Sequence, residues 1–245
     1  MKRIRTLSAL VVVSLVMLAA CSTPDGKPRS NSEPVAPSQV SDFGTLYAQN
    51  CAGCHGAQGS GGAAIALANP VYLAIVDETT MRNIVANGVR GTSMPAFAQR
   101  AGGMLTEQQI EIITSGIFSR WRRKQVLNGA NPPSYTAKAA GNVDHGQLVF
   151  GRYCASCHGS EGKGTSKGSA ITNDSFLALV SDQGLRTIVI TGRPELGALD
   201  WRGNIPGSPM SDQEITDVVA WLASRRVQSP GQPYSAFNDA HHSEK

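Results

Sequence analysis

The segment Cys51-Ala-Gly-Cys54-His55-Gly56 occurs a second time, almost unchanged, as Cys154-Ala-Ser-Cys157-His158-Gly159. Further segments repeat in the same order at offsets of 104 or 105 residues: 69–76 with 173–180, 81–88 with 185–192, and 106–110 with 211–215. Matched blocks in one order indicate two copies of one domain, each shorter than 100 residues.

Each copy has the hydrophobic pattern of helices. The last segment of each copy opens with a capping box, Thr106-x-x-Gln109 in the first and Ser211-x-x-Glu214 in the second. Apolar residues then recur at helical spacing, as Ile110, Ile113, Ile117 and Trp121, and as Ile215, Val218, Val219 and Leu222. Only 6% of the residues are aromatic, which leaves little bulk for two small cores. We therefore predict an all-α tandem repeat in which each small helical domain surrounds something large.

The spacing Cys-x-x-Cys-His is that of covalent haem attachment. Two residues between the thiols let one helical turn reach both vinyl groups of a porphyrin, and the next residue presents an imidazole to the iron. A zinc site made of four cysteines leaves both histidines unexplained, and a thioredoxin-type disulfide needs a βαβ setting that is missing here. We predict two haem c groups per chain, attached through Cys51, Cys54, Cys154 and Cys157, with His55 and His158 as iron ligands.

A second iron ligand is available in the first copy. Met94-Pro95 lies in a loop between two predicted helices, 12 residues before Thr106. A thioether followed by a rigid proline is well placed to reach the open face of the iron, and Met–His ligation raises its potential. The glycine-rich segments 56–62 and 159–164 follow no strand and so do not predict phosphate loops. We expect them to let the backbone approach the haem edge.

On these motifs both copies resemble class I cytochrome c domains, and the whole chain resembles a dihaem cytochrome c lipoprotein. The resemblance covers residues 41–125 and 143–228. It implies single-electron transfer by iron that cycles between the ferrous and ferric states. It also implies that the first and last helices of each domain pack together and that a haem edge is exposed for partner docking.

The second copy departs from this pattern, because Ala198-Leu199 stands at the offset where Met94-Pro95 is expected. Met210, directly before the Ser211 cap, is the candidate ligand that remains in that copy. The alternatives are that Met210 packs against the haem or a helix, or that the second iron is open. Trp201 and Arg202 either bind a haem propionate or stack on each other at the surface. We expect three histidines to face solvent: His145, His241 and His242.

The first twenty residues have the pattern of a bacterial lipoprotein signal. Lys2, Arg3 and Arg5 precede an apolar run from Leu7 to Leu18, and Leu18-Ala19-Ala20-Cys21 matches a lipobox. We predict cleavage before Cys21 and lipidation of its thiol, with an ordinary cleaved signal or an uncleaved anchor as alternatives. The net charge of +4 falls to +1 on cleavage, so nothing in the charge predicts nucleic-acid binding.

These observations divide the chain into six predicted regions. They are a signal peptide (1–20), a disordered tether (21–40), cytochrome c domain 1 (41–125), a linker (126–142), cytochrome c domain 2 (143–228) and a polar tail (229–245). The tether is rich in Pro, Ser and Asn, and it spans on the order of 25 Å.

The sequence predicts a lipid-anchored electron carrier in the bacterial cell envelope, facing the periplasm. Its partners are expected to be respiratory redox donors and acceptors, with the membrane bound through lipidated Cys21. The alternative is a redox enzyme, or the haem subunit of one, with an open second iron that acts on peroxide or sulfur compounds. That alternative lacks a histidine to act as acid or base, because the second loop offers only Arg193, Glu195, Asp200 and Arg202.

Overall fold

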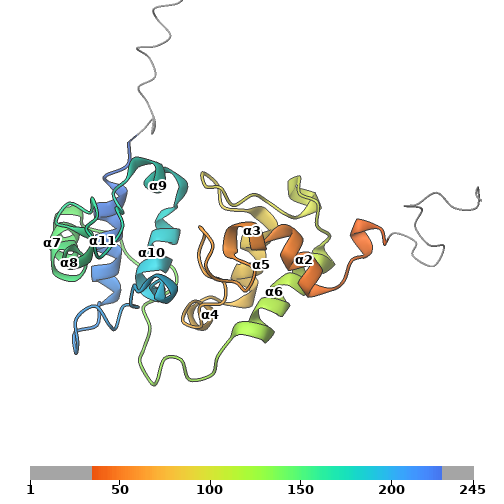
Figure 1. The fold of residues 1–245 in the computed structure, drawn as a ribbon, viewed down its shortest axis with the longest axis horizontal. Coiled ribbons are helices and arrows are strands. Elements are labelled where there is room, and N and C mark those ends of the chain that lie inside the picture. The colour runs from red at the N-terminus through yellow and green to blue at the C-terminus, as the bar shows by residue number, and fades with distance from the viewer. Residues whose placement is uncertain (1–34, 228–245) are drawn as a thin grey trace, which may run out of the picture. The chain divides into compact units, whose positions relative to one another are not determined.

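A computed structural model of the chain describes residues 35–227 (Figure 1). The predicted signal peptide, Cys21, most of the tether, and His241 and His242 in the tail therefore lie outside the described residues. The chain divides into two compact units, residues 1–39 and 40–245. In the first unit the described part contains the short 3-10 helix η1, Pro37–Gln39.

The regular elements in the described part of the second unit are helices joined by loops, and the same order of helices occurs twice (Figure 1). The first series consists of α2 (Phe43–Asn50), α3 (Ala52–His55), α4 (Tyr72–Ile75), α5 (Glu78–Asn87), η2 (Gln99–Ala101) and α6 (Glu107–Trp121). The second consists of α7 (Val143–Tyr153), α8 (Ala155–His158), α9 (Asp174–Leu179), α10 (Asp182–Thr191), η3 (Pro194–Leu196) and α11 (Asp212–Ala223). Residues 35–227 form no strand beyond two isolated bridges, and the predicted all-α tandem fold is confirmed.

The ends of these helices lie where the sequence predicts them. Thr106 and Gln109 form a capping box at the start of α6, and Ser211 and Glu214 form one at the start of α11. Each box satisfies two backbone amides that the first turn of a helix leaves without a partner.

Two hydrophobic cores hold the two series. Ile110, Ile113 and Ile117 of α6 are completely buried in the first core. The second core contains the predicted stripe of α11, and the rings of Phe150 and Trp221 lie 4.3 Å apart in it. Both predicted apolar stripes therefore face a core, except that Trp121 is only half-buried, against Tyr47 and Phe43.

The first and last helices of each series cross at a glycine. A Cβ atom on Gly146 of α7 would lie 2.0 Å from the carbonyl oxygen of Asp217 in α11. A Cβ atom on Gly116 of α6 would lie 2.0 Å from the ring of Phe43 in α2. The missing side chains let each helix pair approach closely, and α7 runs beside α11 in Figure 1. This is the packing that the resemblance implies.

Residues of the predicted linker are held by specific hydrogen bonds. The buried guanidinium of Arg186 in α10 donates to the carbonyl oxygens of Ser134 and Tyr135. The same guanidinium contacts Asp212 Oδ1 at 2.5 Å, and the Ser134 amide donates to that oxygen at 2.8 Å. The linker is thus attached to α10 and α11 of the second series.

Candidate haem sites

Each Cys-x-x-Cys-His segment forms one short helical turn at the end of a longer helix. Cys51 ends α2 and precedes α3, and its carbonyl oxygen accepts from the amides of Cys54 at 3.2 Å and His55 at 3.0 Å. Cys154 does the same between α7 and α8, with distances of 3.1 Å to Cys157 and 3.0 Å to His158. The turn therefore collects two thiols and an imidazole in each series.

The two thiols of each turn differ in burial. Cys51 and Cys154 pack against the two hydrophobic cores, whereas Cys54 and Cys157 are exposed, and none of the four forms a disulfide. Burial, reinforced by the neighbouring thiol, raises the pKa of Cys51 to about 11 and that of Cys154 to about 12. Neither is a thiolate at neutral pH, which does not suit a nucleophilic or redox-active cysteine.

The two histidines are oriented in the same way. His55 Nδ1 lies 2.7 Å from the carbonyl oxygen of Ile65, and His158 Nδ1 lies 2.7 Å from that of Ser169. A carbonyl only accepts, so Nδ1 carries the hydrogen and Nε2 keeps its lone pair for a metal. Burial lowers the pKa of His55 despite its bond to Ile65, which favours the neutral imidazole that binds metals.

The glycine-rich loops fold back on these turns. A Cβ atom on Gly62 would lie 2.1 Å from the carbonyl oxygen of Cys54, and one on Gly168 would lie 3.1 Å from His158 Nδ1. In the structure, the backbone of each glycine-rich loop therefore approaches the Cys-His turn closely. Each turn offers two thiols and one fixed imidazole whose Nε2 is available, with a packed loop behind it. Haem c requires these donors, so the residues fit that cofactor.

Met94 and Ala198 occupy equivalent backbone positions. The Val89 amide donates to the Met94 carbonyl oxygen at 3.0 Å, and the Arg193 amide donates to that of Ala198 at 3.0 Å. The glycines that end α5 and α10 each lie against the same loop: a Cβ atom on Gly88 would be 2.7 Å from the Met94 oxygen, and one on Gly192 would be 2.6 Å from the Ala198 oxygen. The structure therefore gives the second loop an alanine where the first has a methionine.

Met210 lies in the second hydrophobic core, where 2% of its surface is exposed. It directly precedes the cap of α11, just as Leu105, with 5% exposed, directly precedes the cap of α6. Its amide donates to the Trp201 carbonyl oxygen at 2.9 Å, much as the Leu105 amide donates to that of Phe97 at 2.8 Å. This location favours the packing alternative for Met210.

The other candidates in the second loop have partners of their own. Arg202 lies over the Trp201 ring, 4.7 Å from its centre, and binds Asp200 at 2.6 Å. Trp201 is buried in the core, so the stack is only partly at the surface. Arg193 pairs with Glu195.

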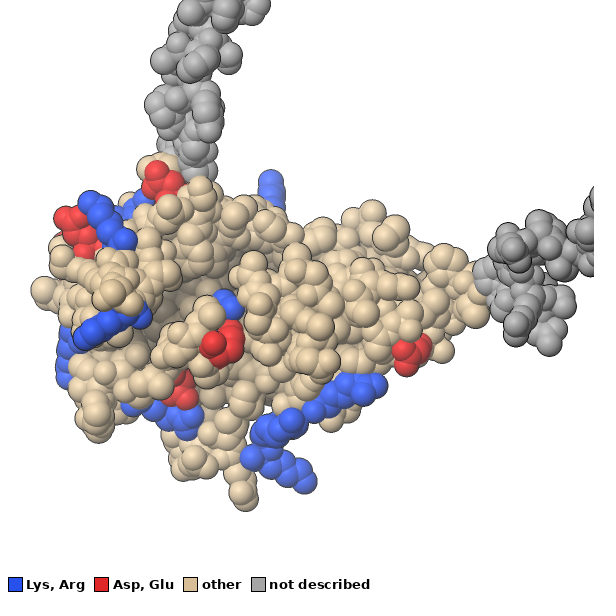
Figure 2. All heavy atoms as spheres, viewed as in Figure 1, with Lys and Arg blue, Asp and Glu red and all other residues tan. Residues whose placement is uncertain are grey.

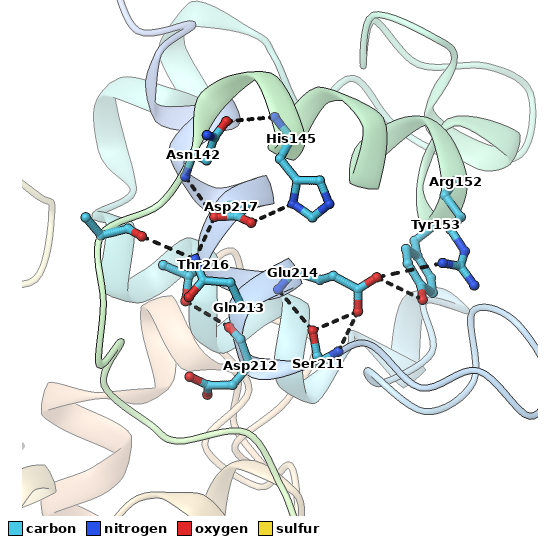
Figure 3. A network of polar contacts seen from close by, with 11 residues as sticks. Asn142, His145, Arg152, Tyr153, Ser211, Asp212, Gln213, Glu214, Thr216 and Asp217 are labelled. Atoms are coloured by element: carbon cyan, nitrogen blue, oxygen red, sulfur yellow. Dashed lines mark hydrogen bonds and ion pairs between the residues drawn. The ribbon is translucent and has the colours of Figure 1, made fainter.

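His145 was expected to face solvent, and half of its side chain does so. Its Nδ1, however, lies 2.7 Å from Asp217 Oδ2 in α11 (Figure 3). The histidine therefore helps to join α7 to α11.

Two hydrogen bonds between the series had no signal in the sequence. The Asn69 side chain donates to the Thr191 carbonyl oxygen at 3.1 Å, and Arg193 Nη2 donates to the Gly62 carbonyl oxygen at 3.0 Å. The second contact joins the loop behind the first Cys-His turn to the loop that contains Ala198. An isolated asparagine or arginine gives no local pattern from which such a partner is predictable.

Two sequence families match the chain. Residues 38–115 match the family described as cytochrome c oxidase, cbb3-type, subunit III, and residues 143–226 match the family described as cytochrome c.

Curated relatives match about half of the chain. The cbb3-type cytochrome c oxidase subunit CcoP of Azospirillum sp. (strain B510) is 33% identical over 131 residues, which are 49% of this chain and 39% of the relative. The subunit FixP of Sinorhizobium medicae (strain WSM419) is 28% identical over 136 residues, 51% of this chain and 40% of the relative. The matched part thus spans about two fifths of the length of these relatives.

Among solved structures, the Kuenenia stuttgartiensis reducing HAO-like protein complex is 16% identical, with a TM-score of 0.42 over 79% of this chain and 100% of the other. The sequence families are the stronger finding, because each matches a separate half and each half contains one Cys-x-x-Cys-His turn. The chain therefore contains two cytochrome c-type domains in tandem, and these matches support a dihaem cytochrome c.

Proposed function

We propose that the chain carries single electrons between respiratory redox partners outside the cytoplasm, as a lipid-anchored protein. The observation that carries the proposal is the pair of Cys-His turns, each with its histidine Nδ1 at 2.7 Å from a loop carbonyl oxygen. Relatives that are subunits of cbb3-type cytochrome c oxidases support a respiratory setting. Neither the family matches nor these relatives favour the alternative of a redox enzyme.

In this proposal the cysteines anchor the cofactor and the histidines bind its metal. Cys51 and Cys54 would hold one haem c and Cys154 and Cys157 the other, while His55 and His158 would each present Nε2. Haem c, when bound, supplies an iron that accepts and releases one electron. Met94, half-buried in its loop, would be the second residue to bind the iron in the first domain. In this proposal the two cytochrome c domains comprise residues 41–125 and 143–228.

Contacts between the two domains support electron passage within one chain. Arg193 Nη2 bonds the Gly62 carbonyl oxygen, and Gly62 packs against the carbonyl oxygen of Cys54. The loop that contains Ala198 therefore touches the loop that backs the first Cys-His turn. Charged side chains cover little of the face drawn in Figure 2, and the cores of protein interfaces are depleted in charged residues.

Attachment to the membrane would come from lipidated Cys21, which lies outside the described residues. No helix within residues 35–227 is long and apolar enough to cross a bilayer. The test is labelling of cells with a radioactive fatty acid. The intact chain should carry the label and sediment with membranes, whereas Cys21→Ala should lose the label.

The electron-transfer proposal is tested by haem content and then by reoxidation. The chain produced with a haem-attachment system should contain two haems. The double variants Cys51→Ala/Cys54→Ala and Cys154→Ala/Cys157→Ala should each retain one. The reduced holoprotein should then be oxidised by membranes that contain a cbb3-type oxidase, with matching oxygen uptake. Oxidation no faster than without the membranes would contradict the proposal.

A further inference from the structure

We propose that the second domain provides no methionine to its iron, and that the open position binds a small neutral ligand such as carbon monoxide or nitric oxide. The inference rests on the proposed function, because it requires haem c in both domains. It concerns which ligand, besides His158, this chain's own residues offer to that iron.

The first observation is that Ala198 stands in the second domain at the backbone position that Met94 has in the first. The matching amide bonds from Val89 and Arg193, both 3.0 Å, put the two residues at the same point of the loop. A methyl group has no lone pair, so Ala198 cannot serve as a ligand. Leu199 replaces the rigid Pro95 beside it.

The second observation is that the other methionines among the described residues lie in a core or on the first domain. Met210 occupies the core position that Leu105 fills in the first domain, with 2% of its surface exposed. Met81 is buried in the first core, and Met104 is 81% exposed on the first domain. Drawing Met210 out to the iron would empty a packed position directly before the cap of α11, which is costly.

The third observation is that the loop offers no other strong ligand. Residues 192–209 contain no histidine, cysteine or lysine. The carboxylates of Glu195 and Asp200 are paired with Arg193 and Arg202. His145 is bound to Asp217 in the α7–α11 pair.

The ion pairs of Arg193 and Arg202 indicate which class of ligand would bind at the second iron. Both guanidiniums in the loop are occupied, Arg193 by Glu195 and the Gly62 carbonyl oxygen, and Arg202 by Asp200 and linker carbonyl oxygens. No uncompensated cation is left in the loop to hold an anion. Leu196 and Leu199 expose 71% and 57% of their surface there. An apolar surface with internally paired charges suits a small neutral ligand, which needs no counter-charge.

The test is carbon monoxide titration of the reduced, full-length holoprotein, followed by the shift of the haem absorption band. The expected result is one carbon monoxide per two haems. The double variant Ala198→Met/Leu199→Pro, which restores the first-domain residues, should weaken this binding at least tenfold. Met94→Ala should add a second binding site and serves as the positive control. Met210→Leu should leave the wild-type titration unchanged.

Several results would overturn the inference. One is a wild-type protein that binds no carbon monoxide. Another is a Met210→Leu variant, or a His241→Ala/His242→Ala variant, that binds more than the wild type, because the replaced residue would then have been the ligand. Haem content, measured on the same sample, separates the two proposals. Two haems without binding contradict the inference alone, whereas fewer than two haems contradict the proposed function as well.

Discussion

Ala198 in the second domain takes the backbone position that Met94 takes in the first, with matching amide-to-carbonyl bonds of 3.0 Å from Arg193 and Val89. If Met94 binds the first iron, as we propose, one scaffold would hold two different ligand sets. Methionine ligation raises a haem potential, so the first domain should hold the higher-potential site. An electron on this chain would then rest mainly in the first domain.

Replacing Met94 by Ala should remove the axial ligand of the first haem. We expect its potential to fall by at least about 59 mV, the shift that corresponds to a tenfold change in a one-electron equilibrium. A spectroelectrochemical titration measures it. Met104→Ala is the matched control, because Met104 is 81% exposed and should leave both potentials unchanged. Equal shifts in both variants would contradict the assignment of Met94.

Replacing Met210 should act on stability. Met210→Ala would leave a cavity in the second core, and we expect a loss of about 2–5 kcal/mol in the free energy of unfolding of that domain. Met210→Leu conserves volume and should cost less than about 1.5 kcal/mol. Chemical denaturation followed by tryptophan fluorescence measures both. A destabilising Leu variant that also changes the haem spin state would instead identify Met210 as a ligand.

The α7–α11 crossing gives a matched pair of glycine variants. Gly146→Ala places a methyl group 2.0 Å from the Asp217 carbonyl oxygen, so the helices must separate, at a cost of about 1–3 kcal/mol. Gly151→Ala, on the same helix, meets nothing within 4 Å. It should stabilise by about 0.5–1 kcal/mol because alanine loses less entropy in a helix. Thermal unfolding compares them, and equal effects would mean that Gly146 is not a contact point.

Asp217 should make the second domain sensitive to acid. Burial raises the pKa of this carboxyl, but bonds from the Asn142 amide, His145 and Gln213 outweigh it and hold the pKa below the ordinary value of 3.8 (Figure 3). A lowered folded-state pKa contributes stability above pH 3.8, and this contribution is lost as the pH falls through the folded value.

The corresponding variant is Asp217→Asn. It should unfold more easily at pH 7, and its melting temperature should fall less than that of the wild type between pH 5 and pH 3. Scanning calorimetry at several pH values measures both quantities. Parallel pH profiles for the two proteins would show that Asp217 does not contribute to the acid sensitivity.

Features that depend on neighbouring residues were predictable from the sequence. The Cys-x-x-Cys-His turns, the two capping boxes and the stripes of α6 and α11 are each set within a few residues, so spacing alone revealed them. The exchange at Ala198 was also visible, because two copies of one domain can be compared position by position.

Features that depend on distant partners were not predictable. His145 was expected to face solvent, yet its partner Asp217 lies 72 positions away. The bond from Asn69 to the Thr191 carbonyl oxygen spans 122 positions, and that from Arg193 to the Gly62 carbonyl oxygen spans 131. For Met210 the sequence left ligation and packing open: the repeat at an offset of 105 aligns it with Leu105, but only the folded chain shows that its side chain is buried in the second core.

Low-temperature electron paramagnetic resonance of the oxidised, haem-loaded protein will show whether the two iron sites in this chain are unequal. We expect one low-spin signal, from the site of His55 and Met94, and one high-spin signal, from the site of His158. Two low-spin signals of equal intensity would contradict this expectation, because both irons would then have six strong ligands.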